Sequence, residues 1–349
     1  MKKFIFIMTL IFSLLAFFSF SPKSGLLGDE DFIVMFYNLE NFFDTINNPL
    51  KSDDEYTPDG GKHWTASRYN LKMKHIWQVI SAVNNNQFPD VIGVCEVENR
   101  RCLEDLIEKT PLKIANYSIF YRESQDRRGI DVAFLYNRKT FHILDTNQFH
   151  IDFKSDSEYH SRDIMYMKGI VARSKDTLHI LANHWPSKFS GEAQTAPLRY
   201  DAGKRLRSVI DSIQSTNNRA KILCIGDFND SPDSKSLTEG LGTLNNWDSI
   251  QTYQLYNIAY YLQYKKKLWT YAYQDQYDIL DQVIISGSLL EKKNLYINPD
   301  NVYPLRYNFM IKREADRPKP YRTYNGYKYD GGFSDHLPMI INFRDATKF

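Results

Sequence analysis

The stretch Ile225-Gly226-Asp227-Phe228-Asn229-Asp230 joins the end of an apolar run, 221–225, to a carboxylate and a carboxamide. The run is typical of a buried strand, and Gly226 marks the start of a turn. Asp227 and Asn229 are two positions apart, so on an extended chain their side chains point to the same side. The stretch therefore predicts a strand whose carboxyl end presents two polar groups together.

A second stretch of the same kind is Ser334-Asp335-His336-Leu337-Pro338, which precedes the apolar run 339–341. It combines a carboxylate with the side chain whose ordinary pKa lies closest to neutrality. Carboxylates, a carboxamide and a histidine placed beside buried strands suggest phosphate chemistry on a metal ion.

The composition allows one large catalytic domain. The chain has 349 residues, of which 42% are hydrophobic, and it shows no Gly-, Pro- or Ser-rich linker and no repeat of fixed period. We therefore expect a single catalytic domain over residues 25–349 rather than a split into two domains. The formal net charge of +2 neither requires nor excludes a polyanionic partner, and no feature implies a protein partner.

The first 24 residues resemble an export signal. Met1-Lys2-Lys3 precedes a nearly unbroken apolar run, 4–20, and small residues follow it. This order predicts a signal peptide over residues 1–24 and an exported protein, either periplasmic or secreted. A retained membrane anchor is the alternative, because the run approaches the length of a spanning helix.

The cysteines do not suggest a disulfide framework. There are only three, Cys95, Cys102 and Cys224, and two of them lie in strand-like apolar runs. We expect them to be buried small hydrophobic residues rather than disulfide partners or a thiol nucleophile.

Strand patterns alternate with a few helical patterns along the chain. Helical spacing of apolar residues predicts helices over 68–83, with Thr65 or Ser67 as the N-cap, over 101–109 and over 196–213. Short apolar runs between polar turns predict core strands over 32–37, 91–95, 130–136, 178–182, 221–225, 278–285 and 339–341. This alternation favours an α/β sandwich.

Polar residues follow these strands at their carboxyl ends. They are Asn38 and Glu40, Glu96, Asn183 and His184, and Asp227 and Asn229. Asp281 instead lies within an apolar run, where a charge is costly unless a partner or a metal meets it.

Six segments in this order resemble the motifs of the endonuclease/exonuclease/phosphatase superfamily. They are Tyr37-Asn38-Leu39-Glu40-Asn41, Cys95-Glu96-Val97-Glu98, Asn183-His184-Trp185-Pro186-Ser187, Gly226-Asp227-Phe228-Asn229, Leu280-Asp281-Gln282-Val283 and Ser334-Asp335-His336-Leu337-Pro338. Any one of them is weak, but six in order make coincidence a poor explanation. The resemblance implies a four-layer α/β/β/α sandwich of two packed mixed sheets, with the site at one edge.

The resemblance also implies hydrolysis of phosphate esters by water, with Mg²⁺ or Mn²⁺ and without a covalent enzyme intermediate. By analogy Glu96 is the principal metal ligand, with Asn38, Glu40 and Asp335 completing the metal site. The oxygen-rich set of donors suits a hard cation better than zinc.

The remaining motif residues receive catalytic roles from the same resemblance. Asp227 and Asn229 orient the attacking water and bind the phosphate. Asp281 fixes the tautomer of His336, which either stabilises charge as an imidazolium or takes a proton as a neutral ring. His184 donates to a phosphate oxygen, and Asn183 supports it.

The basic residues outside these motifs are compatible with more than one role. Arg128 and Arg162 suit either phosphate contact or surface salt bridges. Arg199, Lys204, Arg205 and Arg207 fall on one predicted helix, where a solvated face is the default expectation.

The sequence leaves three candidate functions open, which differ in the substrate. An exported nuclease is favoured, partly because aromatic and basic residues alternate over 321–329 and suit contacts with nucleic acid. The alternative is a phosphodiesterase or phosphatase acting on phospholipid headgroups, inositol phosphates or other small phosphate esters. A binding protein that has lost its chemistry is the third, and the retention of every predicted ligand argues against it.

Overall fold

A computed structural model describes residues 32–83, 88–314 and 317–346. The predicted signal peptide or anchor, 1–24, lies outside these residues. Within them, no helix is both long and apolar enough to span a membrane.

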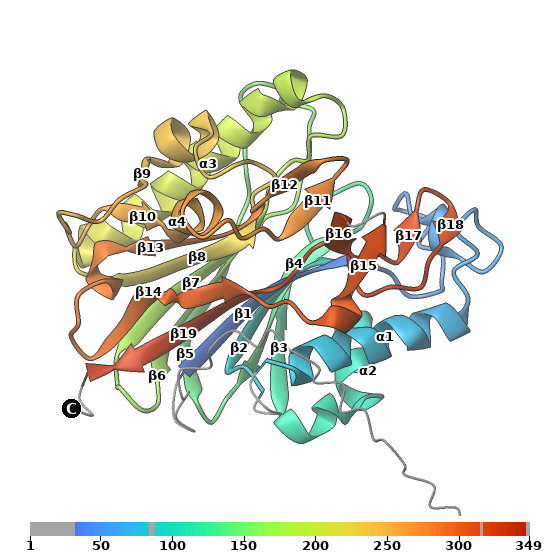
Figure 1. Cartoon of the computed structure of the whole chain (residues 1–349), viewed down its shortest axis with the longest axis horizontal. Helices are drawn as coiled ribbons and strands as arrows, with labels where there is room; N and C mark the ends of the chain where they lie inside the picture. The colour runs from blue at the N-terminus through green and yellow to red at the C-terminus, as the bar shows by residue number, and fades with distance from the viewer. Residues whose placement is uncertain (1–31, 84–87, 315–316, 347–349) are drawn as a thin grey trace, which may run out of the picture. The chain divides into compact units, whose positions relative to one another are not determined.

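Two large mixed sheets form the centre of the described chain (Figure 1). The first has the order β14 (Leu295–Pro304), β19 (Met339–Asp345), β1 (Phe32–Phe42), β2 (Val91–Val97), β4 (Asp131–Asn137) and β3 (Tyr117–Tyr121). The second has the order β5 (Phe141–Phe149), β6 (Ile164–Val171), β7 (Thr177–His184), β8 (Lys221–Asp227), β13 (Asp281–Ser286), β10 (Leu255–Asn257) and β9 (Thr243–Leu244).

Each sheet has a parallel pair near its middle. The strands β1 and β2 are parallel in the first sheet, and β7 and β8 are parallel in the second. The neighbours β19 and β13 run antiparallel to β1 and β8, so they begin at the edge where the parallel strands end. This arrangement brings six chain segments to one edge of the two sheets.

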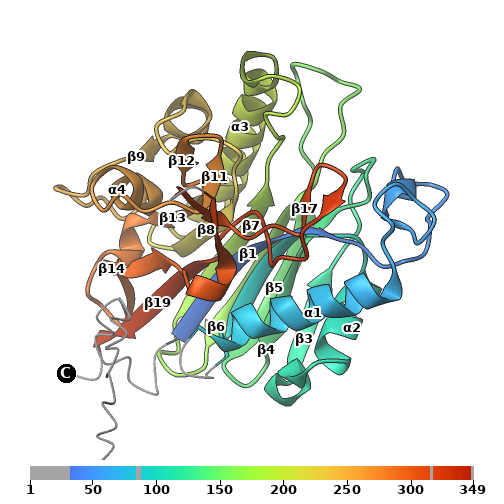
Figure 2. The same cartoon turned by 45° about the vertical axis from the view of Figure 1, so that its right-hand side comes forward.

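Helices cover the outer faces of the sheets (Figures 1 and 2). Helices α1 (Ala66–Ser81) and α2 (Arg100–Glu108) share a buried cluster with the first sheet, and α3 (Glu192–Thr216) shares one with the second. A shorter helix, α4 (Ile258–Tyr264), follows β10. The predicted four-layer α/β/β/α sandwich is confirmed.

Alternation of side chains along β1 explains the layers. Ile33 and Met35 pack toward α1 and α2, whereas Val34 and Phe36 pack between the two sheets. Both faces of the strand are therefore apolar, which accounts for its unbroken hydrophobic run. Burial of one such side chain is worth about 1.5–3 kcal/mol.

Three small hairpins surround the edge where the six segments meet. Their strand pairs are β11 (Tyr271–Tyr273) with β12 (Gln276–Asp278), β15 (Ile311–Glu314) with β16 (Arg317–Pro320), and β17 (Tyr324–Asn325) with β18 (Lys328–Tyr329).

The predicted elements are present, with several corrected bounds. The predicted strand 278–285 is two elements, because β12 ends at Asp278 and β13 begins at Asp281. Thr65 is the N-cap of α1, but its side chain makes no capping hydrogen bond. The strands that carry the polar residues are longer than predicted, so Asn38, Glu40 and Glu96 lie inside β1 and β2 rather than after them.

Candidate active site

Bulges in β1 and β2 redirect the first two motifs toward this edge. The pairing of β1 with β2 shifts register between Asn38 and Phe42, where Glu40 and Asn41 have φ values of 49° and 53°. Glu96 has a φ of 60°, at a register shift between β2 and β4. Left-handed conformations at non-glycine residues are strained, and such bulges often lie beside functional sites.

Asn38 connects the two sheets through its amide group. Its Nδ2 donates to Glu96 Oε1 at 3.3 Å in the first sheet and to Asp227 Oδ2 at 3.1 Å in the second. Its Oδ1 accepts from the backbone N–H of Glu40 at 2.9 Å. Asn38 therefore fixes the position of the Glu96 carboxylate relative to the Asp227 carboxylate.

Glu96 is a half-buried carboxylate beside this amide. Its Oε2 accepts from the backbone N–H of Asn41 at 2.8 Å, and its Oε1 lies 3.7 Å from His184 Nε2. The side chain is 15% exposed. A carboxylate that is held by few donors and still reaches solvent suits a hard divalent ion that keeps several waters.

Asp227 is buried at the centre of the site. Its Oδ1 accepts from the backbone N–H of Asn229 at 2.9 Å, while its Oδ2 lies 3.6 Å from His184 Nε2 and 3.8 Å from His336 Nε2. Burial raises the pKa of Asp227 to about 7, although the His336 cation opposes the rise and the Asp281 carboxylate adds to it. The carboxyl group is thus poised to accept a proton near neutral pH.

His336 and Asp281 form a buried pair. The imidazole Nδ1 lies 2.7 Å from Asp281 Oδ2. Burial opposes charge on the ring, but the Asp281 and Asp227 carboxylates together raise the pKa of His336 well above its ordinary value. The sequence left the charge of this ring open, and the geometry favours the imidazolium.

His184 has the opposite protonation. Burial, with the Arg162 and Arg128 cations, lowers its pKa well below the ordinary value, so the ring is neutral. Its Nδ1 is buried and makes no hydrogen bond in the described structure. A neutral ring has one N–H to donate, and its distances from Glu96 and Asp227 exceed those of a hydrogen bond.

The loop after β7 is held by polar contacts to Trp185. Asn183 Oδ1 accepts from Trp185 Nε1 at 3.3 Å, while Asn229 Nδ2 donates to the Trp185 carbonyl at 3.1 Å. Arg162 Nη2 donates to the same carbonyl at 2.6 Å. Asn183 therefore supports the loop that directly follows His184, and one hydrogen of the Asn229 amide is engaged with the same loop.

Glu40 and Asp335 lie among cations and backbone donors. Glu40 Oε2 accepts from the backbone N–H of Thr323 at 2.6 Å and is 3.8 Å from Lys72 Nζ. Arg322 Nη2 lies 2.9 Å from Asp335 Oδ2. Burial and the Asp335 carboxylate raise the pKa of Glu40 to about 7.

Sequence reasoning missed Lys72 and did not foresee that Arg162 is buried. Lys72 falls with Tyr69, Met73 and Ile76 on the buried face of α1, and a lysine on such a face signals a buried charge that needs a partner. Arg162 makes a buried ion pair with Asp126 at 3.0 Å rather than a surface salt bridge.

The prediction that the four basic residues of α3 lie on a solvated face is wrong for one of them. Arg199 is fully buried and its Nε lies 3.0 Å from Asp230 Oδ2. It shares a helical face with Thr195, Ala202 and Leu206, which are buried as well. Arg199 therefore ties α3 to the turn that follows Asn229.

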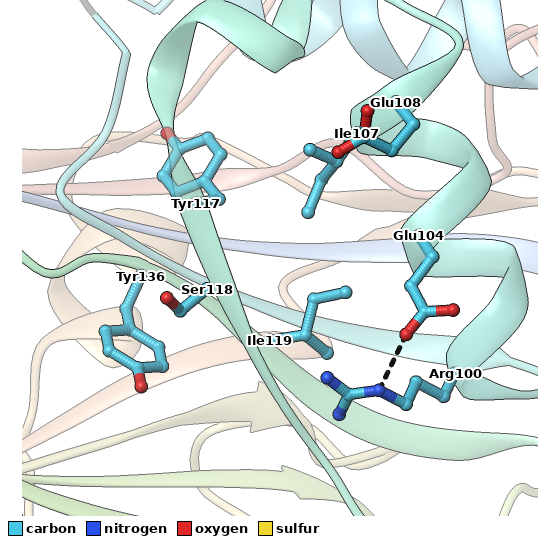
Figure 3. A pocket seen from close by; sticks show the side chains of 8 residues that line it. All are labelled: Arg100, Glu104, Ile107, Glu108, Tyr117, Ser118, Ile119 and Tyr136. Carbon is cyan, nitrogen blue, oxygen red and sulfur yellow. Dashed lines mark hydrogen bonds and ion pairs between the residues drawn. The ribbon is translucent and has the colours of Figure 1, made fainter.

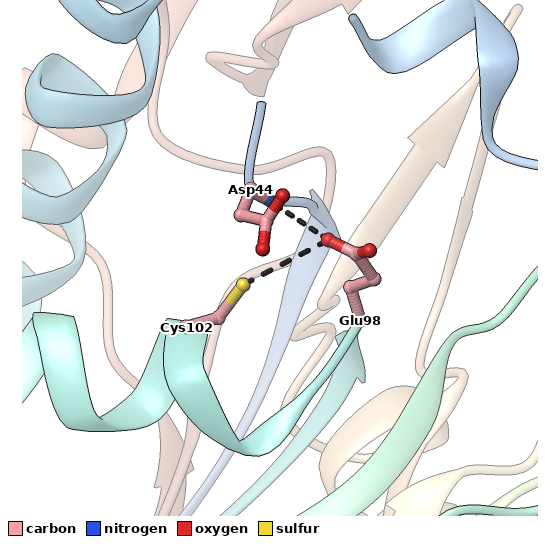
Figure 4. Close-up of side chains that lie close together, drawn as sticks. All are labelled: Asp44, Glu98 and Cys102. Atoms are coloured by element: carbon pink, nitrogen blue, oxygen red, sulfur yellow. Dashed lines mark hydrogen bonds between the residues drawn. The ribbon is translucent and has the colours of Figure 1, made fainter. Parts of the chain in front are cut away.

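Two other features of the structure, a pocket and an acidic cluster, lie apart from these residues. A pocket between α2 and the strands β3 and β4 is lined by Tyr117, Ile119, Tyr136 and residues of α2, and includes none of the predicted site residues (Figure 3). Asp44, Glu98 and Cys102 also lie close together (Figure 4).

The arrangement of the Asp44 cluster is explained by its own hydrogen bonds. Glu98 Oε2 accepts from the backbone N–H of Asp44 at 2.6 Å, and Asp44 Oδ2 accepts from Asn99 Nδ2 at 3.1 Å. Burial raises the pKa of the Cys102 thiol well above its ordinary value, which favours the neutral thiol over the thiolate. The cluster joins the loops that follow β1 and β2.

The predicted burial of the cysteines is confirmed, since Cys95, Cys102 and Cys224 are all free and buried. None of them belongs to the cluster around Asp227. The side chains beside Glu96 are the Asp227 carboxylate and one neutral imidazole, and the Asn38 amide turns its Nδ2 toward both carboxylates. This chemistry fits Mg²⁺ or Mn²⁺ better than a zinc site built from several Cys and His ligands.

A model of the Endonuclease/Exonuclease/phosphatase family matches residues 33–345. The chain belongs to this family. The predicted class of enzyme, a phosphoric ester hydrolase, is thereby confirmed, and enzymes of the endonuclease/exonuclease/phosphatase family generally depend on a divalent metal. A search of the curated proteins finds no match.

Solved structures share the fold at low sequence identity. Truncated TDP2 from Caenorhabditis elegans is 16% identical with a TM-score of 0.54, over 90% of this chain and 97% of that one. The human nocturnin catalytic domain with bound sulfate is 14% identical with a TM-score of 0.51, over 90% and 94%. TDP2 from D. rerio, complexed with a single strand DNA product, is 13% identical with a TM-score of 0.55, over 90% and 100%. These likenesses concern the fold alone.

Proposed function

We propose that the protein is a nuclease that hydrolyses phosphodiester bonds with Mg²⁺ or Mn²⁺. The observation that carries the proposal is the placement of a carboxyl group with a pKa of about 7, Asp227, between the protonated His336 and the Asn38 amide. This combination provides a base for water and a cation for the phosphate at the same point.

Each side chain has one task in this mechanism. Asp227 accepts the proton of the attacking water. The imidazolium of His336, oriented by Asp281, stabilises the charge that develops on the phosphate, and neutral His184 donates its single N–H to a phosphate oxygen. Asn229 supports the water or the phosphate with the amide hydrogen that Trp185 leaves free.

Glu96, with Asn38 beside it, would hold the metal. A divalent ion there supplies stabilisation of negative charge on the phosphate and on the leaving oxygen. The structure supports Glu40 and Asp335 as metal ligands less directly than Glu96. Glu40 already accepts from a backbone N–H, and Asp335 already pairs with the Arg322 cation.

Exposed aromatic side chains support a nucleic acid as the substrate. Phe189 is 97% exposed and lies five positions after His184 in the sequence. Tyr273 is 56% exposed and lies two positions after Tyr271, whose ring contacts the His336 ring. Tyr327, 69% exposed, lies with Lys62 4.7 Å above its ring. Such groups suit stacking on unpaired bases, and the D. rerio TDP2 complex shows single strand DNA on a protein of this fold.

Purified protein should first be assayed on plasmid DNA, single-stranded oligonucleotides and bis(4-nitrophenyl) phosphate, with Mg²⁺ or Mn²⁺ and with chelator. Chelator-sensitive cleavage of DNA is the expected result. Cleavage of the small ester alone would instead favour phospholipid headgroups or other small esters, which vesicles containing phosphatidylinositol phosphates or sphingomyelin would then test.

We also propose that the protein is exported, on the basis of the segment 1–24 alone. Fractionation of cells that express a tagged chain, with sequencing of the mature amino terminus, tests this directly. A cytoplasmic chain with an intact amino terminus would contradict the proposal.

A further inference from the structure

Hydrogen bonds explain how Asp44, Glu98 and Cys102 are arranged, but they leave the charge of this cluster without a counter-ion. One ligand atom of each residue lies within 4.8 Å of the other two (Figure 4). Asp44 and Glu98 are each only 8% exposed. Within the described part of the chain, neither carboxylate makes an ion pair with a lysine, an arginine or a histidine. Two nearly buried negative charges therefore lie side by side and uncompensated.

Asp53 adds a third buried carboxylate from the same loop. It is 2% exposed, and its Oδ2 accepts from the backbone N–H of Asn48 at 3.0 Å. Its Oδ1 is also buried and has no hydrogen-bond partner among the described residues. The charges of Asp53 and Asp44 both act on Glu98, so the unpaired oxygen belongs to the same acidic cluster. A buried acceptor without a donor is costly and indicates a partner that the protein itself does not supply.

The loop 43–56 brings the acids together without giving them a cation. The rings of Phe43 and Tyr56 stack with their centroids 4.3 Å apart, so the two ends of the loop lie against each other. Lys51 is the one basic residue of this segment, and its Nζ lies 2.9 Å from Glu123 Oε1. The loop therefore directs its own cation toward another segment of the chain.

The cluster is separate from the candidate metal site at Glu96. The Glu96 carboxylate contacts Asn38 in the first sheet and His184 in the second. Glu98 instead lies 4.0 Å from the sulfur of Cys102 on α2, in the layer where the first sheet packs against its helices. The two acidic groups thus serve different layers of the fold.

We propose that Asp44, Asp53 and Glu98 bind one Ca²⁺ ion, which joins the loops that follow β1 and β2. Three carboxylates at short distance repel one another, and a divalent cation removes this repulsion and pairs with the free Asp53 oxygen. Ca²⁺ accepts many oxygen ligands from flexible loops, whereas Mg²⁺ keeps several of its waters. The burial of the cluster therefore favours Ca²⁺. The neutral Cys102 thiol is too soft a donor to contribute.

The site is best measured in Glu96→Gln, which lacks the principal carboxylate of the candidate active site. We expect isothermal titration with Ca²⁺ to give one site in this variant, and one site in the wild type with Mg²⁺ present. Ca²⁺ at about 100 times its dissociation constant should raise the melting temperature of both by roughly 5 °C.

Asp53→Asn should weaken Ca²⁺ binding by roughly tenfold or more, because affinity follows the charge of the ligands. Asp54→Asn is the matched control, since Asp54 is the next residue and its side chain is exposed. It should bind Ca²⁺ as the wild type does. Circular dichroism verifies folding, and Glu98→Gln replaces Asp53→Asn if the latter does not fold.

Two results would overturn the Ca²⁺ site. One is the absence of any Ca²⁺-dependent rise in the melting temperature of Glu96→Gln, which would mean that the acids are balanced by protons or that the ion binds at Glu96. The other is wild-type affinity for Ca²⁺ in folded Asp53→Asn. No substrate enters these measurements, so a failure of the proposed nuclease activity leaves them unchanged.

Discussion

Asp227 and His336 influence each other's protonation, because Asp227 Oδ2 lies 3.8 Å from His336 Nε2. Burial pushes both groups toward the neutral form, and each group's charge pulls the other toward the ionised form. Asp281 raises the pKa of both groups, because its carboxylate favours the His336 cation and disfavours a second anion at Asp227. The two groups therefore titrate as a coupled pair rather than independently.

The rate of phosphodiester hydrolysis should rise with pH. Asp227 must lose its proton to act as a base, and its pKa is raised to about 7. The activity should therefore rise through a midpoint near pH 7 and level off about one pH unit above it, with a lower midpoint where bound metal stabilises the carboxylate. His336 keeps its proton past this range, because its pKa is raised well above the ordinary value. A profile of kcat/KM against pH measures this limb.

Asp227→Asn should lower kcat by roughly a hundredfold or more and abolish the rising limb, because the positioned base is gone. Asp300→Asn changes an exposed carboxylate that pairs with Lys266 and should leave both unchanged. A rate within threefold of wild type in folded Asp227→Asn would remove Asp227 from the mechanism.

At the scale of elements, polar contacts between loops position the site. Arg162, just before β6, donates both to Asp126 in the segment between β3 and β4 and to the Trp185 carbonyl after β7. The ends of three loops are thus joined through one guanidinium. The contact is buried, which makes it costly to break on one side only.

Asp126→Asn should destabilise the protein by about 3–5 kcal/mol at pH 7, because it leaves the Arg162 cation buried without a counter-ion. Although burial opposes it, Arg162 lowers the pKa of Asp126 below its ordinary 3.8. The carboxylate therefore contributes stability above pH 3.8 that is lost as the pH falls through the folded-state pKa. The difference between variant and wild type should be constant near neutrality and shrink below about pH 4.

Urea unfolding at a series of pH values measures this difference. Asp211→Asn removes a carboxylate from the exposed ion pair with Arg207 and should change stability by no more than about 1 kcal/mol. An equal loss of unfolding free energy from the two substitutions would show that the buried Asp126 pair contributes no more to stability than the exposed Asp211 pair.

At the scale of the whole molecule, the site spans both sheets. Asn38 and Glu96 come from the first sheet, whereas His184 and Asp227 come from the second. The Asn38 amide is one direct hydrogen-bonded link between them, and the contact of His336 with Asp281 is another. Unfolding of either sheet separates the carboxylates, so a metal ion that binds there stabilises the folded chain as a whole.

Mg²⁺ at about 100 times its dissociation constant should stabilise the fold by about 2.7 kcal/mol. This corresponds to an increase of roughly 5 °C in the melting temperature, measured by differential scanning calorimetry with Mg²⁺ and with chelator. Glu96→Gln should lose the increase, and Glu104→Gln, an exposed change on α2, should keep it. An undiminished increase in Glu96→Gln would place the ion elsewhere.

Much of this architecture follows from local sequence. The apolar runs of β1, β2, β7 and β8 predict strands because both of their faces are buried, and the polar residues at their carboxyl ends predict which edge carries the chemistry. The six motifs were sufficient to predict the family and the four layers. Such features depend on residues within a few positions of one another.

Tertiary structure alone decided the charges within the site. The protonation of Asp227, His184 and His336 depends on burial and on carboxylates and cations far away in sequence. The neighbours of Glu40 come from α1 and from the segment 322–324, more than 250 positions later. Electrostatic energy depends on distance in space, which the order of residues does not specify, so the sequence determined the candidate groups and the fold determined their states.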